Sequence, residues 1–334
     1  MRQSRYGGNS MTELYPFRLS SVTKSPIWGG TRLLRDWGKE SAAATVGESW
    51  ELTVRKNEKS VILDGPLAGK TLEEVIAETG SALIAPDWCE PTFPLLIKLI
   101  DAADRLSVQV HPDDTYAAQA EHDRGKTEMW YIVDADPDAE IVCGLREGIG
   151  RAEFAAAVRA GKIDSVLHRQ KVKPGETYFI PAGLLHAIGR GILIAEIQQN
   201  CDLTYRVYDY DRKGADGKPR ELHVEKALDV VRPFTEKEIN AIRFSQRSDA
   251  LADGEVLADC DFFRVERLKL TGQTVTLPDY AGMRHLLCVD GAATLSCGGT
   301  DYAVAKGGNR ESWFLPPHLP LTVTGTATLI FSAV

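Results

Sequence analysis

The sequence contains no apolar run that approaches the ~20 residues of a membrane-spanning helix. Its first residues, MRQSRYGGNSM, include two arginines, but no apolar segment follows them. We therefore predict no secretory signal and a disordered tail over residues 1–14. These absences argue against a membrane protein and against a secreted one.

The sequence also lacks a CxxC pair and a basic stripe. Six cysteines are scattered along the chain, a spacing that predicts reduced, packed thiols and a cytoplasmic location. The formal net charge is −8, which disfavours nucleic acid and anionic membranes as partners. An acidic chain can still bind a small anion, provided that arginine and lysine side chains gather locally.

What the sequence does contain is mainly β-structure. Short apolar runs alternate with glycine and proline turns, and helical spacing is confined to 71–79, 151–169 and 223–232. We predict a catalytic β-barrel domain with helical insertions over residues 15–236. A second β-domain follows over 237–334, with 233–239 as the crossing between them. The second domain repeats part of the first, because KGGNRESWFLPPHL echoes KPGETYFIPAGLLH, but without a ligand histidine at the matching offset.

Four residues are candidate metal ligands. Gln109 and His111 are two apart on a predicted strand, so their side chains point to one face. Glu128 begins another strand, and His186 follows a glycine turn. Such a set of nitrogen and oxygen ligands suits zinc, iron, manganese, cobalt or nickel, whereas each histidine taken alone is more often a packed or surface residue.

The spacing around His186 is more specific. Gly175, Pro181, Gly183 and His186 stand at the offsets of the second signature of the cupin barrels, and Gln109-Val110-His111 with a distant Glu128 resembles the first. We predict that Gly175 and Gly183 make turns, that Pro181 ends a strand, and that His186 points towards a metal. The predicted fold is therefore a cupin-type β-barrel (jelly roll) with helical additions and a second, degenerate cupin-like barrel.

Longer motifs narrow the resemblance. PIWGGTRL, GESWEL, FPLLIKLIDA, LSVQVHPDD, KTEMWYI, IPAGLLHAIG and NCDLTYRVYDYDR resemble, in order and over nearly the whole chain, the type I mannose-6-phosphate isomerases in their short bacterial form. The resemblance implies a zinc-dependent aldose–ketose isomerase that interconverts mannose 6-phosphate and fructose 6-phosphate. It implies one Zn²⁺ on His111, Glu128 and His186, with or without Gln109, and an active-site arginine at Arg206.

Further candidates follow from the reaction, which moves a proton between two carbons through an enediolate. Glu196, a carboxylate in the apolar strand ILIAEIQQ, is the candidate base, although a solvent-facing or arginine-paired residue is nearly as good an interpretation. Lys126, beside Glu128, is a candidate catalytic residue.

Lys98, Ser107 and Arg212 are candidate substrate-binding residues, and Arg206 and Arg212 are the candidate phosphate ligands. Alternatively, Arg206 and Arg212 pair with Asp209 and Asp211 in a surface network.

Three other functions stay open. Two histidines and one carboxylate also describe a non-haem iron oxygenase, which would leave the arginines and lysines unexplained. A non-catalytic phosphosugar-binding cupin would leave Glu196 without a purpose. A glucose-6-phosphate isomerase on the same fold is a closer variant. The chain is expected to be a monomer or a homodimer.

Overall fold

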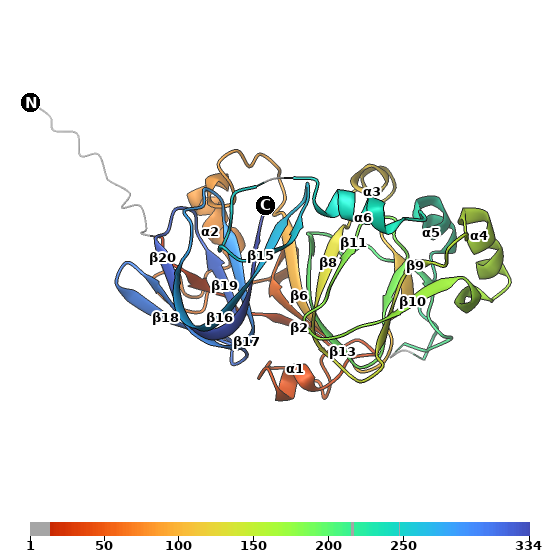
Figure 1. The fold of residues 1–334 in the computed structure, drawn as a ribbon, viewed down its shortest axis with the longest axis horizontal. Helices are drawn as coiled ribbons and strands as arrows, with labels where there is room; N and C mark the ends of the chain where they lie inside the picture. Colours follow the sequence, from red (N-terminus) through yellow and green to blue (C-terminus); the bar gives the residue numbers. More distant parts are fainter. Residues whose placement is uncertain (1–13, 215–216, 247) are drawn as a thin grey trace, which may run out of the picture.

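The computed structural model describes residues 14–214, 217–246 and 248–334, and it is built mainly from antiparallel strands. Three sheets lie side by side, and most of the helices lie towards one end, while α2 (Leu72–Thr79) lies near the other end and α1 (Arg32–Arg35) near the middle (Figure 1). The predicted disordered tail lies outside the described residues except for Leu14. No helix within the described ranges has the length and apolarity to cross a membrane.

The central sheet has six antiparallel strands. In spatial order they are β11 (Thr177–Ile180), β8 (Glu128–Ala135), β13 (Ile192–Gln199), β6 (Leu95–Ala102), β3 (Glu48–Leu52) and β2 (Val22–Lys24). β6 and β13 are buried along their whole length. Both faces of this sheet are therefore covered, which explains their nearly continuous apolar sequences.

The inner face of the central sheet packs against a sheet of five strands. They are β10 (Leu167–Lys171), β9 (Glu140–Leu145), β12 (His186–Ile188), β7 (Val108–Val110) and β14 (Tyr205–Tyr208). One apolar cluster joins the two sheets and includes Trp130 and Ile194 from the central sheet and Ile141 and Ile188 from the five-stranded one. The space between these two sheets is where the predicted metal ligands meet.

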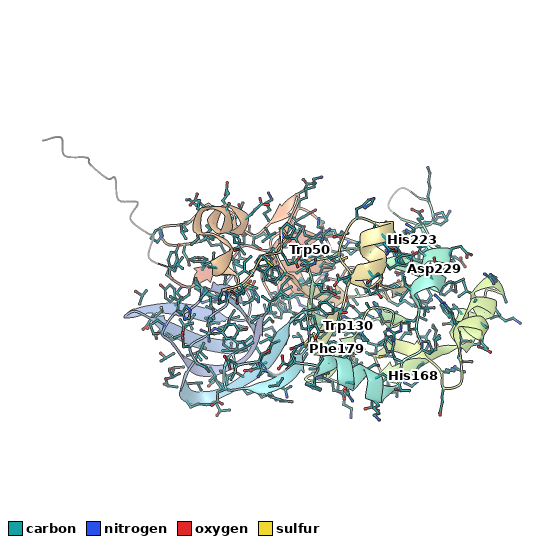
Figure 2. The ribbon with its side chains drawn as sticks, turned by 90° about the horizontal axis from the view of Figure 1, so that it is seen from above. Trp50, Trp130, His168, Phe179, His223 and Asp229 are labelled. Atoms are coloured by element: carbon teal, nitrogen blue, oxygen red, sulfur yellow. The ribbon has the colours of Figure 1, made fainter. Side chains whose placement is uncertain are left out.

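The outer face of the five-stranded sheet is covered by α4 (Arg151–Arg159) and α5 (Val224–Val230), while α3 (Asp114–Ala120) follows β7. Seen from above, His223 and Asp229 at the two ends of α5 lie towards this helical end of the molecule, whereas Trp130 lies nearer its middle (Figure 2).

The third sheet carries most of the C-terminal residues. Its strands are β1 (Phe17–Arg18), β19 (Ser312–Leu315), β17 (Arg284–Cys297), β20 (Leu321–Ala333), β16 (Arg264–Thr276) and β15 (Glu255–Asp259), with β18 (Thr300–Ala305) paired to β17. One of its faces packs on the outer face of the central sheet, and its other face encloses a separate core.

The remaining elements are short. They are α1 (Arg32–Arg35), α2 (Leu72–Thr79), α6 (Glu236–Arg243), the 3₁₀ turns η1 (Ser81–Leu83) and η2 (Ile163–Ser165), and the hairpin of β4 (Val54–Arg55) and β5 (Glu58–Lys59).

The mainly β prediction is confirmed, and so is the helix at 71–79, which begins at a Thr71–Glu74 capping box. The helical prediction for 151–169 is too long, because the chain passes through η2 and enters strand β10 at Leu167. The predicted crossing at 233–239 contains the start of helix α6. The division into domains at residue 237 stays a prediction.

Candidate active site

A row of four side chains crosses the inner face of the five-stranded sheet. In the antiparallel register, Cys143 on β9 faces His186 on β12, His186 faces Gln109 on β7, and Gln109 faces Arg206 on β14. Directly opposed residues in a sheet project to the same side. Residues that are far apart in the sequence therefore line up across the sheet at one level.

A second row crosses the inner face of the central sheet. Here Tyr178 on β11 faces Trp130 on β8, Trp130 faces Glu196 on β13, Glu196 faces Lys98 on β6, and Lys98 faces Trp50 on β3. Since the two sheets pack face to face, the two rows form opposite walls of one site.

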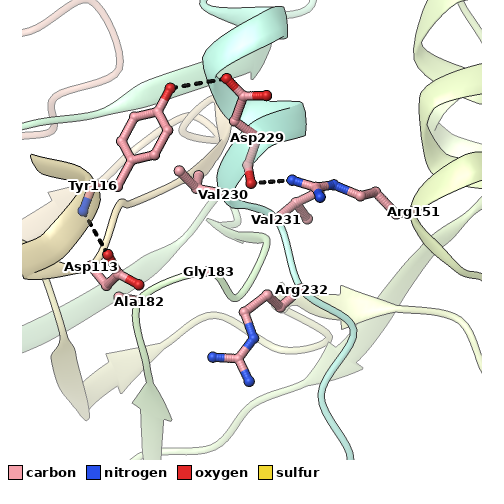
Figure 3. A pocket seen from close by; sticks show the side chains of 9 residues that line it. All are labelled: Asp113, Tyr116, Arg151, Ala182, Gly183, Asp229, Val230, Val231 and Arg232. Atoms are coloured by element: carbon pink, nitrogen blue, oxygen red, sulfur yellow. Dashed lines mark hydrogen bonds between the residues drawn. The ribbon is translucent and has the colours of Figure 1, made fainter. Parts of the chain in front are cut away.

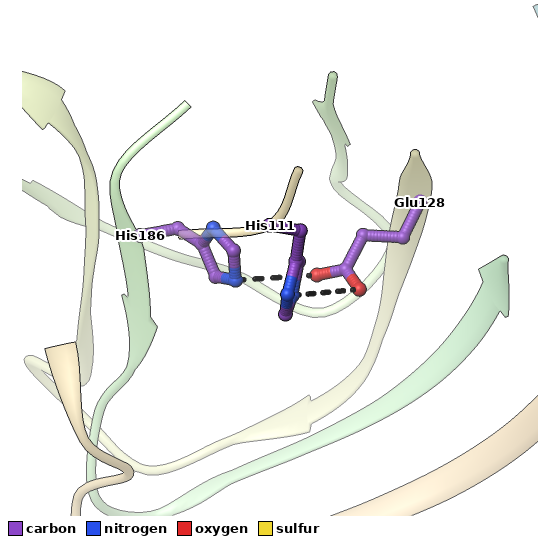
Figure 4. Close-up of side chains that lie close together, drawn as sticks. All are labelled: His111, Glu128 and His186. Carbon is purple, nitrogen blue, oxygen red and sulfur yellow. Dashed lines mark ion pairs between the residues drawn. The ribbon is translucent and has the colours of Figure 1, made fainter. Parts of the chain in front are cut away.

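His111, Glu128 and His186 come together between these walls (Figure 4). All three are buried, and a potential ligand atom from each lies within 4.8 Å of the others. The Nε2 atoms of His111 and His186 are each 3.5 Å from a different oxygen of Glu128. Ligands held at about 2.1 Å by a tetrahedral ion are about 3.4 Å apart, so these side chains fit a metal with little movement.

The protonation of the two rings also suits a metal. Burial lowers the pKa of His186 to about 4 and holds the pKa of His111 well below its usual value, with the Lys126 ammonium adding to both shifts. His186 Nδ1 lies 2.9 Å from the carbonyl oxygen of Leu184 and donates to it, which leaves the Nε2 lone pair towards Glu128. Both imidazoles are neutral at pH 7, as metal ligands must be.

Glu128 supplies the carboxylate, and it is incompletely satisfied. Its Oε1 accepts a hydrogen bond from Trp130 Nε1 at 3.0 Å. Its Oε2 is 2.7 Å from Lys126 Nζ yet receives no hydrogen bond of good geometry from the described chain. Burial raises the pKa of Glu128 to about 7, helped by the Glu196 carboxylate. A buried carboxylate in this condition is stabilised by a cation.

Gln109 lies beside this cluster. Its Nε2 is 3.3 Å from His186 Nε2, and its Oε1 accepts a hydrogen bond from Ser107 Oγ at 3.4 Å. A half-turn of the amide group would present Oε1 to the cluster instead. The residues that fit a divalent ion are therefore the two histidines and Glu128, with Gln109 within reach as a fourth.

Glu196 is buried between two cations. Its carboxylate is 3.4 Å from Lys98 Nζ and accepts a hydrogen bond from Trp130 Nε1 at 3.2 Å, while its Oε2 has no hydrogen-bond partner among the described residues. Burial alone would raise the pKa of Glu196, but the ammonium groups of Lys126 and Lys98 outweigh it and lower the pKa. The site thus holds an ionised carboxylate whose Oε2 is paired with the Lys98 ammonium but accepts no hydrogen bond from the described residues.

Lys98 and Lys126 stay charged although both are buried. Burial opposes their charge, but neighbouring carboxylates outweigh it and raise the pKa of each lysine. Lys98 Nζ is 3.6 Å from both Glu48 and Asp202, in addition to Glu196, and it lies 5.0 Å above the Trp50 ring. A buried ammonium needs an anion nearby, and for Lys98 the protein's own carboxylates supply it.

The two candidate phosphate arginines differ in their surroundings. Arg212 is paired with Asp209 at 2.6 Å and with Asp104 at 3.2 Å, as the surface-network alternative supposes. Arg206 has no ion pair in the described structure, donates to the carbonyl of Glu221 at 2.9 Å, and keeps a buried Nε without a partner. Burial lowers the pKa of Arg206, and the cationic Arg220 and Arg212 nearby add to the shift. Arg206 is therefore the arginine that still lacks an anion.

Sequence reasoning did not single out Glu48, Asp202 and Arg220. Glu48 is two residues before Trp50 in the strand GESWEL, so the two side chains project to the same face. The sequence could therefore have placed Glu48 on the inner face. Arg220 donates to the same Asp209 carboxylate as Arg212, a contact between segments that only the fold brings together.

The sequence and the fold both match known proteins. Residues 16–148 match phosphomannose isomerase type I, catalytic domain, and residues 254–334 match the mannose-6-phosphate isomerase cupin domain. The probable mannose-6-phosphate isomerase GmuF of Bacillus subtilis is 37% identical over 322 residues, covering 95% of this chain and 99% of that protein. Mannose-6-phosphate isomerase of Streptococcus mutans is 38% identical over 292 residues, covering 87% of this chain and 90% of that protein.

Two crystal structures extend the comparison. Mannose 6-phosphate isomerase from Bacillus subtilis superposes with a TM-score of 0.85 at 33% identity, covering 96% of this chain and 99% of the other. A putative mannosephosphate isomerase from Archaeoglobus fulgidus shares the fold with a TM-score of 0.72 at 20% identity, covering 97% and 99% of the two chains. The predicted cupin-type fold is confirmed by these matches.

Proposed function

Since this chain belongs to the type I mannose-6-phosphate isomerase family, we propose that it interconverts mannose 6-phosphate and fructose 6-phosphate between the two rows of side chains described above. One observation carries the proposal. A buried His–Glu–His cluster, an ionised carboxylate whose Oε2 accepts no hydrogen bond from the described residues, and an arginine without an anion face the same space between two sheets.

Zn²⁺ is the proposed cofactor, held by His111, Glu128 and His186, and Gln109 lies within reach as a fourth ligand. A divalent ion bound there supplies a Lewis acid that polarises the substrate carbonyl and shares the negative charge of the enediolate. The same two-histidine, one-carboxylate set would also suit an iron oxygenase, but the relatives over almost the whole chain favour the isomerase.

Glu196 is the proposed base. Its carboxylate takes the proton from C2 of the aldose, the C–H electron pair becomes the C1–C2 double bond, and the carbonyl oxygen gains the negative charge. The O2 hydroxyl proton then passes to O1, and returning the first proton to C1 as the C2–O2 double bond forms yields the ketose. Because Lys98 and Lys126 keep Glu196 ionised near pH 7, it accepts a proton without first having to lose one.

Lys126 is the proposed electrostatic partner. Its ammonium lies 2.7 Å from Glu128 and 3.2 Å from His111 Nε2, so it sits at the edge of the metal cluster. A charged donor in a buried site stabilises an oxyanion strongly, because no water reorganises around it. Lys98 and Ser107 are the proposed contacts to the sugar hydroxyls.

Arg206 is the proposed phosphate ligand. It lies two strands from His186 in the same row, a distance of roughly 10 Å at the usual strand spacing. In an open-chain hexose phosphate the carbonyl and the phosphate are separated by a distance of similar size. The long side chain of Arg206 can make up the difference between the two distances. Arg212 has an auxiliary role at most, because Asp209 and Asp104 already pair with it.

We further propose that the protein works in the cytoplasm as a monomer or homodimer, on a small phosphorylated sugar and without nucleic acid or membrane as partner. A net charge of −8 and the absence of a CxxC pair support this proposal.

An assay of the purified protein tests the function. Mannose 6-phosphate is supplied, and fructose 6-phosphate is followed over time with a coupled enzyme. Turnover with added zinc is the expected result, and zinc binding without turnover would support a non-catalytic sugar-binding protein instead. Substituting glucose 6-phosphate in the same assay checks the closest alternative substrate.

A further inference from the structure

A small pocket lies beside the turn that precedes His186, and none of the candidate metal ligands lines it. Its volume is about 260 Å³, and its lining includes Gly183, Asp113 and Tyr116 together with the end of α5 (Figure 3). Asp229–Arg232, which we call the α5 strap, form one wall of this pocket. The strap contacts three segments that are distant in sequence: α3, α4 and the turn at Gly183.

The strap is hydrogen bonded to the backbone that presents the metal ligands. The backbone N–H of Arg232 donates to the carbonyl of Gly183 at 2.8 Å, and the N–H of Gly183 donates to the carbonyl of His111 at 2.9 Å. The next residue, Leu184, holds His186 Nδ1 through its own carbonyl at 2.9 Å. A single hydrogen-bonded path therefore runs from the strap to both metal-binding histidines.

The contact at Gly183 leaves no spare room. Gly183 has a φ of +90°, and a Cβ at this position would lie 3.0 Å from the carbonyl oxygen of Val230 in the strap. The position of the strap thus limits where the turn can lie. A shift of the strap would move the turn, and with it the direction of the His186 ring.

Two side chains hold the strap in place. Arg151 of α4 donates through Nε to the carbonyl of Leu228 at 2.5 Å and through Nη2 to the carbonyl of Asp229. Tyr116 of α3 donates its hydroxyl to the Asp229 carboxylate at 3.1 Å (Figure 3). The last carbonyls of a helix have no partner within the helix, so the Arg151 guanidinium satisfies and charge-stabilises this end of α5.

Helix α5 has only seven residues, too few for a stable isolated helix, so it depends on contacts such as those of Arg151 and Tyr116. Its first end is tied to the other part of the site, because the N–H of His223 donates to the carbonyl of Arg206 at 2.7 Å. One short helix therefore spans from the proposed phosphate ligand to the turn that carries His186.

We propose that Arg151 and Tyr116 are positioning residues of the metal site, acting through the α5 strap on Gly183 and so on His111 and His186. The inference rests on the proposed function only in supposing a divalent ion at these histidines. Neither side chain contacts the metal ligands directly, and Arg151 is exposed on the surface. Losing these contacts allows the strap and the turn to drift, which weakens metal binding without removing any ligand.

The test measures zinc affinity instead of catalysis. Metal-free wild-type protein, Arg151→Met, Arg151→Lys and Tyr116→Phe are titrated with Zn²⁺ against a chromophoric chelator, and the thermal unfolding of each metal-free protein is recorded. Arg159→Met is the matched control, because Arg159 also lies on α4 and is exposed, with no side-chain bond found for it in the described chain.

We expect Arg151→Met to lose roughly tenfold in zinc affinity. Changes to residues that orient metal ligands typically lower metal affinity about 10- to 100-fold, and Arg151 acts only indirectly. Tyr116→Phe loses less, Arg151→Lys recovers part of the affinity, and Arg159→Met matches the wild type. The metal-free unfolding temperatures fall slightly, because hydrogen bonds at the end of α5 are lost, but by too little to account for the loss of affinity.

Wild-type zinc affinity in both Arg151→Met and Tyr116→Phe would overturn the proposal. A fall in metal-free stability that accounts for the whole loss of affinity would also overturn it, because the contacts would then be structural only. Failure of the wild-type protein to bind zinc would refute the proposed metal site itself. The titration distinguishes this result from unchanged affinity in the variants and from a general loss of stability.

Discussion

Glu196→Gln removes the proposed base while changing little else. Glutamine keeps the size of the side chain and can still accept the hydrogen bond from Trp130 Nε1. Lys98 retains Glu48 and Asp202 at 3.6 Å, and Lys126 retains Glu128 at 2.7 Å, so neither lysine is left without a counter-charge. We therefore expect a folded variant that binds zinc and mannose 6-phosphate.

The catalytic effect is set by the lost proton acceptor. A positioned acid–base residue contributes typically about 10²–10⁴-fold, so kcat should fall by this factor, which corresponds to about 2.7–5.4 kcal/mol of transition-state stabilisation. The exchange of the C2 hydrogen with deuterated solvent, followed by NMR, should fall in parallel. Both processes require the same proton transfer.

Glu48→Gln is the matched control. It also removes one carboxylate from beside Lys98, but Glu48 bonds to Trp50 and not to Trp130. An equal loss of kcat in Glu48→Gln would show that the charge on Lys98 is what matters. Isomerisation near the wild-type rate in Glu196→Gln would refute the assignment outright, and loss of zinc would make Glu196 a structural residue.

Three further predictions concern the anion site, acid stability and a buried ion cluster. Arg206→Ala should lower kcat/KM for mannose 6-phosphate roughly 10- to 100-fold through a raised KM, with metal content unchanged, because a charged hydrogen bond is lost. Equal losses with unphosphorylated mannose would place Arg206 at the reacting carbons. Burial of His285 in β17 lowers its pKa from 6.5 to about 3. Between these pH values the unfolded chain binds a proton at this histidine and the folded chain does not. The free energy of unfolding therefore falls as the pH is lowered from 6.5. Urea unfolding at pH 6.5 and 4.5 should show His285→Asn losing about 2.3 kcal/mol less than wild type, and equal losses would contradict this. Lys39 is buried between Glu51 at 2.7 Å and Glu311, so Lys39→Met should destabilise the fold by roughly 3–5 kcal/mol. Lys59→Met, which removes a partly exposed partner of the exposed Glu73, should cost less than about 1 kcal/mol, and similar losses in the two variants would contradict the prediction.

The turn that presents His186 was predictable because local sequence determines its geometry. Gly175 and Gly183 both have the positive φ that the motif predicts, +89° and +90°, and β11 ends at Ile180 just before Pro181. Gly183 then turns the chain so that β12 begins with His186. Turn residues act over a few positions, which is why the single-chain pattern carried this information.

The two rows of side chains were not predictable in the same way. They depend on the pairing of β12 with β7 and β9, and of β13 with β6 and β8, across separations that no local pattern encodes. A shift of one residue in the pairing of β13 with its neighbours would turn Glu196 out of the site. The pairing of Phe17 with Phe314, which brings the first strand into the C-terminal sheet, is another long-range contact of this kind.

Two segments were misassigned for physical reasons. In strand β10 four of the five residues are exposed, and apolar and polar residues do not alternate, so the sequence gives no strand signal. The segment is a strand because it is hydrogen bonded to β9. Helix α6 has no fully buried residue, but its Thr235–Glu238 capping box was visible in the sequence and gave the better signal.

Metal-dependent isomerisation at His111, Glu128 and His186 is tested most directly by the activity of metal-depleted protein before and after zinc is returned. Chelated wild-type protein should convert no mannose 6-phosphate, and one equivalent of Zn²⁺ per chain should restore fructose 6-phosphate formation. His186→Ala should retain neither the metal nor the activity under the same conditions. Full turnover by exhaustively chelated wild-type protein, or by His186→Ala, would contradict the central claim.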